Sequence, residues 1–294
     1  IILSLTKVRE AIFNCIPPAL KYGVTSGIGL FIAFIGMQNA KIVVDGPTLV
    51  GLYPFRAALL DGSFYTVGIG AFLALMGTLL TAILMAKKVP GGILWGILIT
   101  WAVGMICEMT GIYIPDPAQG MFSVMPDFSH GIAIPSLAPT FMHLDFSAIA
   151  TLNFLTIMLT FMFVDLFDTL GTLIGVASKA DMLDKQGRLP NIKGALLADS
   201  IATTAGAVLG TSTVTTFVES SAGVGAGGRT GLTAVVSASL FALSLLLAPI
   251  FRAIPAFATA PALIVVGFLM VSSLMRIDFD DLTEAVPAYI ATIA

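Results

Sequence analysis

Three carboxylates, Asp165, Asp168 and Glu219, lie in stretches of sequence that are otherwise apolar enough to sit in a lipid bilayer. Ionisable side chains are costly at membrane depth, and those that persist there mark solute pathways or proton relays. No Lys or Arg lies within these stretches to neutralise them. Burial without a cation, together with a neighbouring carboxylate, favours the protonated form of a carboxyl group. We therefore expect at least one of Asp165 and Asp168 to gain and lose a proton, as proton-coupled transport requires.

The spacing of the polar residues around these aspartates is helical. Asp165, Asp168, Thr169 and Thr172 stand at i, i+3, i+4 and i+7, which places the four side chains on one helix face. That face is either a solute and proton site or a buried polar network that only holds helices together. The lack of a cation favours the site. Which aspartate takes the proton and which contacts the solute stays open.

Residues 211–217 (TSTVTTF) carry β-branched side chains at alternating positions, which predicts a short extended strand. Glu219 and Ser220 follow after Val218, and a glycine-rich half-helix comes next. A broken element of this kind is tolerated at membrane depth only where it lines a cavity or is buried in protein, and it marks the substrate site of many secondary transporters. We expect Glu219 and the aspartate face to bind a flat, uncharged solute with adjacent N–H donors. The hydroxyls of Thr169, Thr216 and Ser220 complete the predicted binding set.

The elements that must position these residues are membrane spans. The chain is 57% hydrophobic and 11% charged, with a mean hydropathy of +1.00, which predicts a polytopic membrane protein. A shorter pair of segments is expected within 194–227 and a further helix from residue 282. Six clear spans are predicted at residues 22–44, 66–86, 92–114, 146–177, 232–251 and 261–275.

The charges give an orientation and exclude some partners. Lys and Arg lie in the loops before the first span, at Lys87 and Lys88, and at 179–193, so these loops are predicted to be cytoplasmic. The loop at 113–145 has no Lys or Arg and is predicted to be outside. The net charge of −3 and the scattered basic residues leave no nucleic-acid footprint. Because the sequence begins at Ile1 and ends in an apolar stretch, we expect a piece of a longer protein.

Metal and cofactor sites are not predicted. His130 and His143 lie in the outer loop without further ligands at a workable spacing. The glycines at 223–228 fit a dinucleotide-binding pattern, but the required acidic residue about 20 positions later is missing. Cys15 and Cys107 are interpreted as buried free thiols. No cofactor is expected beyond the proton as coupling ion.

Two motifs carry a family resemblance, residues 164–177 (VDLFDTLGTLIGVA) and residues 210–235 (GTSTVTTFVESSAGVGAGGRTGLTAV). They resemble the AzgA-like adenine/guanine/hypoxanthine permeases of the nucleobase–cation symporter 2 superfamily, also called nucleobase–ascorbate transporters. Weaker similarity extends to residues 28–44 and 258–267. The resemblance implies an all-α polytopic membrane protein with an inverted repeat of seven plus seven segments, core and gate domains, and short β-strands at the substrate site.

On that template the chain covers about segments five to thirteen. The resemblance implies gate-domain spans at 1–114, an extracellular loop at 115–145, core-domain spans with the substrate site at 146–251, and further gate-domain spans at 252–294. It implies that Asp165, Asp168 and Glu219 contact a purine, with Asp165 and Asp168 as the proton-coupling residues. It also implies residence in the plasma (inner) membrane, and it is compatible with a homodimer.

The sequence thus predicts an importer of purine nucleobases that works by proton symport and alternating access. Guanine, hypoxanthine and adenine are left undecided, as is sodium in place of the proton. An anion transporter of the same fold is an alternative, but it would need basic residues at the site. An intramembrane aspartyl protease would need two aspartates from two helices, whereas Asp165 and Asp168 share one. We therefore do not expect an enzyme.

Overall fold

A computed structural model describes residues 2–6, 11, 15–47, 49–129, 136–147, 149–179, 182, 189–190, 192–217, 220–225 and 227–293. The chain forms two compact units, each assembled from separate stretches of sequence. Unit 1 comprises Ile1–Thr25, Pro135–Ala242 and Ser273–Ala294, and unit 2 comprises Ser26–Ile134 and Leu243–Ser272. The predicted division into gate and core at residues 114, 145 and 251 is a division by transport role, and it stays a prediction.

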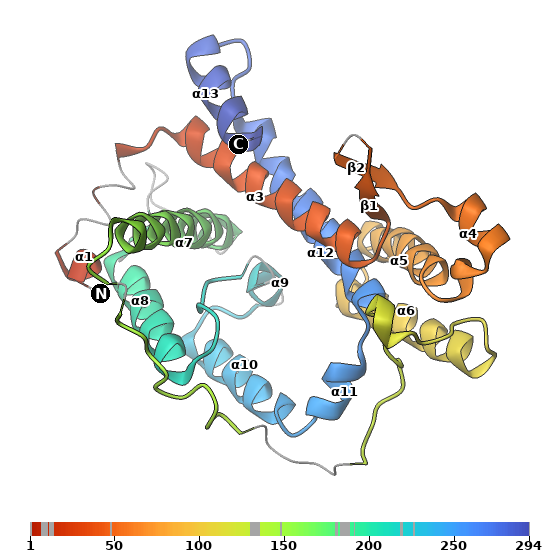
Figure 1. The fold of residues 1–294 in the computed structure, drawn as a ribbon. Coiled ribbons are helices and arrows are strands. Elements are labelled where there is room, and N and C mark those ends of the chain that lie inside the picture. The colour runs from red at the N-terminus through yellow and green to blue at the C-terminus, as the bar shows by residue number, and fades with distance from the viewer. Residues whose placement is uncertain are drawn as a thin grey trace. The chain divides into compact units, whose positions relative to one another are not determined.

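Most of the described chain is helical (Figure 1). The longer helices are α3 (Pro18–Asn39), α5 (Gly68–Ala86), α6 (Gly92–Met109), α7 (Leu152–Lys179), α8 (Ile192–Leu209), α10 (Gly231–Ser244), α12 (Ala256–Val271) and α13 (Leu282–Ile293). The short ones are α1 (Ile2–Leu5), α4 (Phe55–Asp61), α9 (Ser220–Gly225) and α11 (Ala248–Ala253), with 3-10 turns η1 (Ser63–Tyr65), η2 (Pro117–Gln119) and η3 (Ser272–Arg276).

Five helices among the described residues are long and apolar enough to cross a membrane: Pro18–Asn39, Gly68–Ala86, Gly92–Met109, Ile192–Leu209 and Ala256–Arg276. Large apolar side chains stay exposed along the helices, for example Phe31, Leu79 and Phe241. Exposure of this kind suits a lipid environment and is unusual for a protein surface in water.

The structure corrects two of the predicted spans. Residues 232–251 form two helices, α10 and α11, with a turn at 245–247 between them. Pro249 has no backbone N–H to donate to the preceding turn, so it breaks the apolar run. Residues 194–209, expected as half of a shorter pair, belong to the full-length helix α8. Gly210 ends this helix with φ +73°, a left-handed conformation that glycine adopts without strain.

The strands also differ from expectation. The sheet in the described chain is an antiparallel hairpin of β1 (Val43–Gly46) and β2 (Leu49–Leu52), in which Val43 pairs with Leu52 and Gly46 with Leu49. Residues 211–217 run without helix between α8 and α9, but they are not a β-strand. A strand needs a partner ladder, and no described segment supplies one to these residues.

The two cysteines are free. Cys107 is buried, as expected, whereas Cys15 is exposed, so the prediction that it is buried is wrong. Cys15 lies three residues before α3 begins.

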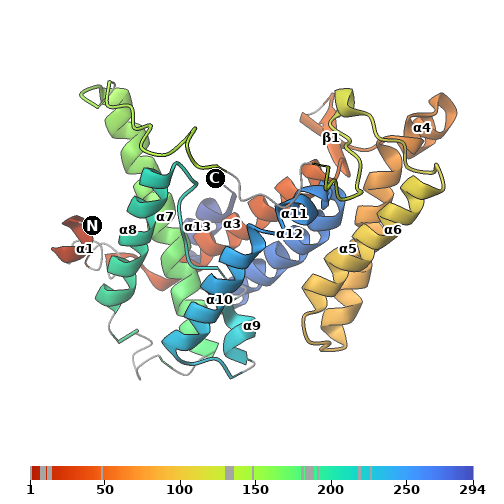
Figure 2. The same cartoon turned by 90° about the horizontal axis from the view of Figure 1, so that it is seen from below.

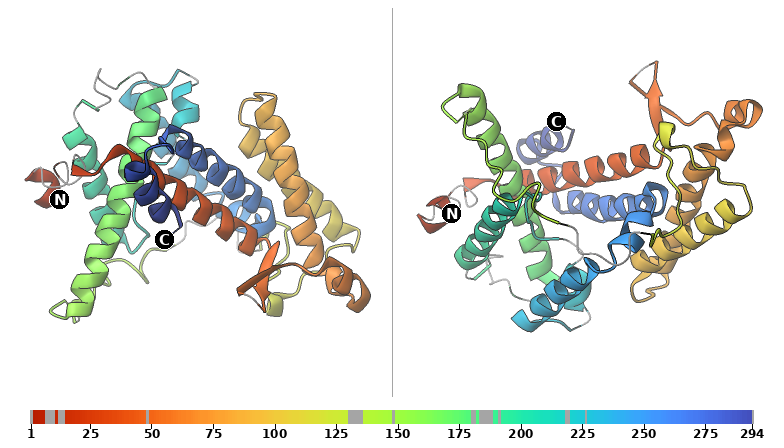
Figure 3. Two further views of the ribbon diagram at one scale, coloured as in Figure 1. Left: turned by 90° about the horizontal axis from the view of Figure 1, so that it is seen from above. Right: turned by 60° about the horizontal axis from the view of Figure 1, so that its bottom comes forward.

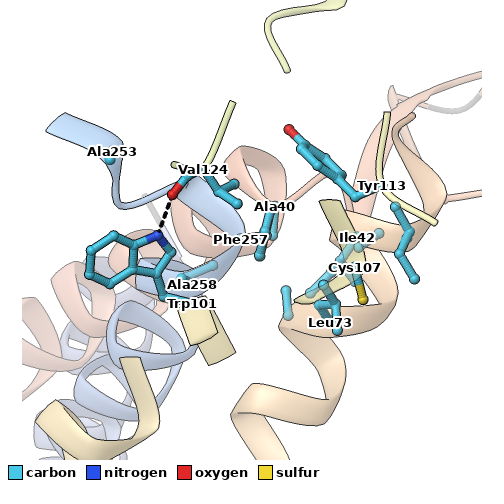
Figure 4. Packing of buried hydrophobic residues seen from close by; sticks show 14 residues of the cluster. Ala40, Ile42, Leu73, Trp101, Cys107, Tyr113, Val124, Ala253, Phe257 and Ala258 are labelled. Atoms are coloured by element: carbon cyan, nitrogen blue, oxygen red, sulfur yellow. Dashed lines mark hydrogen bonds between the residues drawn. The ribbon is translucent and has the colours of Figure 1, made fainter. Parts of the chain in front are cut away.

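The core of unit 2 lies among α5, α6 and α12, which pack against one another (Figure 2). Phe257 of α12 is central to this core (Figure 4). A Cβ atom added at Gly104 would come within 2.8 Å of the Phe257 ring, and one at Gly70 within 3.2 Å. Glycines at these positions give the ring its space. Small residues commonly serve such close helix packing in membranes.

The second half of α3 contacts α12 through backbone (Figure 3). A Cβ atom on Gly29 would lie 2.7 Å from the carbonyl oxygen of Gly267. A Cβ atom on Gly267 would in turn overlap the carbonyl oxygen of Gly29 and come 2.7 Å from the Cβ of Ala33. The two helices can approach this closely only because both positions are glycine.

Glu108, near the end of α6, holds the loop that follows it. Its Oε2 accepts a hydrogen bond from the Val124 amide at 2.8 Å, and its Oε1 accepts one from the Ser123 hydroxyl at 2.6 Å. The Trp101 indole N–H donates to the Val124 carbonyl at 2.8 Å (Figure 4). The Tyr113 hydroxyl donates to the Phe122 carbonyl at 2.7 Å. These bonds fold the loop against the core of unit 2.

We expect Glu108→Ala to destabilise the protein by about 1–3 kcal/mol, because it leaves the Val124 amide and the Ser123 hydroxyl without their acceptor. Glu108→Gln is the matched control: its amide oxygen can accept from Val124 and its amide nitrogen can donate to Ser123, so it should stay near wild type. Thermal unfolding of the purified protein and protease cleavage within residues 115–129 measure the effect. Equal stability of the Ala variant and the wild type would contradict this role.

Candidate functional site

The polar face predicted on α7 is confirmed for the described residues. Thr169 and Thr172 are buried, with 0% and 4% of their surface exposed, and Asp165 and Asp168 are half-buried. Leu166 on the same side packs against Leu196 of α8. The helical spacing therefore turns all four polar residues toward the interior of unit 1.

Helix α8 holds the extended segment 211–217 in place. The Thr203 hydroxyl donates to the Val214 carbonyl at 3.0 Å and lies 3.2 Å from the Thr213 hydroxyl. The extended segment passes close to α8 at Gly206, where an added Cβ atom would come 3.1 Å from the Ser212 carbonyl oxygen. Side-chain hydroxyls of a helix thus satisfy backbone groups that have no ladder partner among the described residues.

A chain of hydrogen-bonding oxygens joins α7, α8 and the extended segment. The Thr215 hydroxyl lies 3.1 Å from Asp168 Oδ2, and the same hydroxyl lies 3.2 Å from that of Thr169. The Thr169 hydroxyl in turn lies 3.2 Å from Oδ1 of Asp199, on α8. Two carboxyl groups are therefore connected through two threonine hydroxyls.

The other predicted residues have different outcomes. Thr216 is half-buried, and its hydroxyl makes no hydrogen bond within the part of the chain that the structure describes. Ser220 is exposed at the start of α9, which packs against α7. Glu219 lies outside the described residues. The structure thus brings Asp168 and Thr169 together with Thr215, and it leaves the prediction for Glu219 as it was.

Sequence reasoning missed Asp199. It is 9% exposed, and it stands in an 18-residue helix that is apolar enough to cross a membrane. The same signal that singled out Asp165 and Asp168, an acidic residue in an apolar helix, could have found it. The interpretation of residues 194–227 as a pair of short segments does not predict this site.

The arrangement can bind a polar organic solute. Within the described residues, no three His, Cys, Asp or Glu side chains lie close enough to hold a metal ion. His143 is exposed in the loop, and His130 lies outside the described residues. Carboxylate oxygens accept hydrogen bonds and threonine hydroxyls both donate and accept, so a ligand with neighbouring N–H groups and acceptors would be complementary.

Comparison with known proteins agrees with this chemistry. The Xan_ur_permease model, described as a permease family, matches residues 1–294. The chain belongs to this permease family. It is 50% identical over 294 residues to the protein MJ0326 of Methanocaldococcus jannaschii, covering 100% of the chain and 62% of that protein. It is 43% identical to the guanine/hypoxanthine permease PbuG of Bacillus subtilis, covering 99% of the chain and 61% of PbuG. It is 38% identical to the adenine permease AdeQ of Escherichia coli, covering 99% of the chain and 60% of AdeQ.

The family assignment settles the class of protein. Members of this permease family are transporters, so the protease alternative is excluded. The family and the several apolar helices together make the chain part of a multi-pass membrane protein. The chain spans about three fifths of the length of the curated relatives it matches.

Proposed function

We propose that the permease imports purine nucleobases by proton symport with alternating access. The observation that carries this proposal is the cluster formed by Asp168, Thr169, Thr215 and Asp199, in which acidic and hydroxyl groups from three segments meet inside apolar helices. The names of the relatives PbuG and AdeQ support a purine as the solute. Residence in the plasma membrane and assembly as a homodimer belong to the same proposal.

The chemistry of the cluster suits a purine. Purine bases present ring and exocyclic N–H donors beside ring acceptors, and the cluster offers carboxylate acceptors with hydroxyls that do both. We propose Asp165, Asp168 and Glu219 as the acidic contacts, with Thr169, Thr216 and Ser220 completing the pocket. Guanine carries a ring N–H beside an exocyclic NH2, and hypoxanthine carries ring N–H groups, so both can donate hydrogen bonds to these carboxylates.

A proton supplies enough free energy for accumulation. One proton moving down about 100 mV contributes about 2.3 kcal/mol, and a gradient of one pH unit adds about 1.4 kcal/mol. Together these correspond to an accumulation of about 500-fold for a neutral solute carried with one proton.

Uptake of radiolabelled hypoxanthine tests the proposal. Cells that lack their own purine permeases would express the full-length protein, with unlabelled adenine, guanine, uracil and sulfate as competitors and with or without a protonophore. We expect competition by purines alone and loss of accumulation under the protonophore. Competition by sulfate would favour the anion alternative. No uptake by protein shown to reach the membrane would overturn the purine assignment.

A further inference from the structure

We propose that Asp168 and Asp199 share a single proton, which passes between them through the hydroxyls of Thr215 and Thr169. This inference rests on the proposed proton symport. It adds Asp199 to the residues that move the proton, and it gives the hydroxyls of Thr169 and Thr215 a role in proton coupling.

The argument begins with a count of hydrogens. The chain from Asp168 through Thr215 and Thr169 to Asp199 has three oxygen–oxygen contacts of 3.1–3.2 Å. Each threonine hydroxyl carries one hydrogen, and an ionised carboxylate carries none. With both aspartates ionised, two hydrogens must serve three contacts. The two threonine oxygens would then face each other at 3.2 Å with no hydrogen between them.

One added proton completes the chain in either of two arrangements. With the proton on Asp199, its carboxyl donates to Thr169, Thr169 donates to Thr215, and Thr215 donates to ionised Asp168. With the proton on Asp168, every donor direction is reversed. Both arrangements use the same oxygen positions, so neither requires the helices to move. A fully hydrogen-bonded buried network is favoured over one with an unsatisfied contact.

Transfer between the two arrangements is balanced. Three O–H bonds break and three form as the proton of Asp199 moves to Thr169, that of Thr169 to Thr215, and that of Thr215 to Asp168. No charge stays on a threonine, and one proton has moved from α8 to α7. Asp168 is the more exposed end of the chain and Asp199 the more buried one.

The described residues of the elements packed around this chain of oxygens carry few other charges. Asp165 lies one turn from Asp168 on α7. The segment 211–217 and helix α9, which lie against α7, carry no titratable side chain in their described residues, and neither does α1, which packs on α8. Lys179 ends α7, and Lys193 lies in the first turn of α8. In this proposal, a solute that binds beside Asp168 changes how the shared proton is distributed between Asp168 and Asp199.

Threonine variants test the proton path. In the full-length protein, Thr215→Val removes the hydroxyl in the middle of the path at almost unchanged volume, and Thr215→Ser keeps it. We expect Thr215→Val to exchange internal for external hypoxanthine but to lose the proton-driven accumulation of about 500-fold. Thr215→Ser should restore it. Thr160→Val on α7, whose hydroxyl donates to its own helix at the Thr156 carbonyl, is the matched control and should accumulate normally. Normal accumulation by Thr215→Val would overturn the proposal.

If Thr215→Val folds poorly and loses exchange as well, infrared spectroscopy of the carboxyl groups tests the shared proton instead. The shared proton gives one carboxylic-acid carbonyl band that belongs to the pair. An asparagine amide can donate in place of a protonated carboxyl, so Asp168→Asn and Asp199→Asn should each remove this band, whereas Asp116→Asn in the outer loop should keep it. If the band persisted in Asp199→Asn, the proton would belong to another residue, and the proposal that Asp168 and Asp199 share it would be wrong. If the wild type exchanges no purine, the proposed function fails, but the infrared result still decides the shared proton.

Discussion

Asp168→Asn is expected to abolish the accumulation of purine while leaving the exchange of purine across the membrane in place. An asparagine cannot gain or lose a proton, so the variant should equilibrate a neutral base, and the concentration ratio should fall from about 500 towards one. Exchange should stay within about tenfold of wild type, because a single altered hydrogen bond is worth about 1 kcal/mol. The measurement is uptake against external pH: wild-type uptake should rise as the external pH falls, and the variant should show a flat profile.

Asp165→Asn is the comparison that makes this result decisive. If Asp168 carries the coupling, Asp165→Asn should keep the pH dependence, and a change in its apparent affinity for purine would indicate a solute contact. A flat pH profile in Asp165→Asn with a normal profile in Asp168→Asn would move the proton to Asp165. Surface labelling of each variant checks that the protein reaches the membrane in equal amounts.

Gly267→Leu is expected to prevent stable packing of unit 2. Its side chain would have to occupy the place of the Gly29 carbonyl and of Ala33 on α3, both of which belong to the opposing helix rather than to a mobile side chain. Forcing bulk into a closely packed contact costs about 1–3 kcal/mol for a few added methylene groups. With backbone as the obstacle, we expect a loss of more than about 3 kcal/mol. The measurement is the fraction of monodisperse protein that survives heating in detergent.

Gly194→Ala provides the control for Gly267→Leu. Gly194 is also a helical glycine, on α8, but an added Cβ atom there meets nothing within 4 Å. Alanine at this position should be neutral or stabilise by up to about 1 kcal/mol, because it restricts the unfolded chain more than glycine does. If Gly267→Leu survived heating as well as Gly194→Ala, the close approach of α3 and α12 would be wrong.

The sequence alone determined the membrane class, most of the helices and the polar face of α7. The composition determines the membrane class, because the long apolar helices of such a chain expose a surface that is unfavourable in water and favourable in lipid. The polar face follows from local geometry, because side chains at i, i+3, i+4 and i+7 share a side of any helix. The break at Pro249 was also readable, since proline removes a backbone donor wherever it stands. The prediction of one span at residues 232–251 follows the length of the apolar run and does not include the effect of this proline.

Tertiary structure alone decided which groups meet. Asp199 is 30 residues from Thr169, and Thr215 is 47 residues from Asp168, so no spacing rule connects them. Their contact depends on how α7 packs on α8 and on where Thr203 ties the extended segment. In the same way, nothing in the sequence distinguishes Gly29 and Gly267 from the other glycines of the 29 in the chain. Only the packing of α3 on α12 shows that their backbones are in contact. Residue type and periodicity say which side of a helix is polar, but only the packing of helices distant in sequence says which donor faces which acceptor.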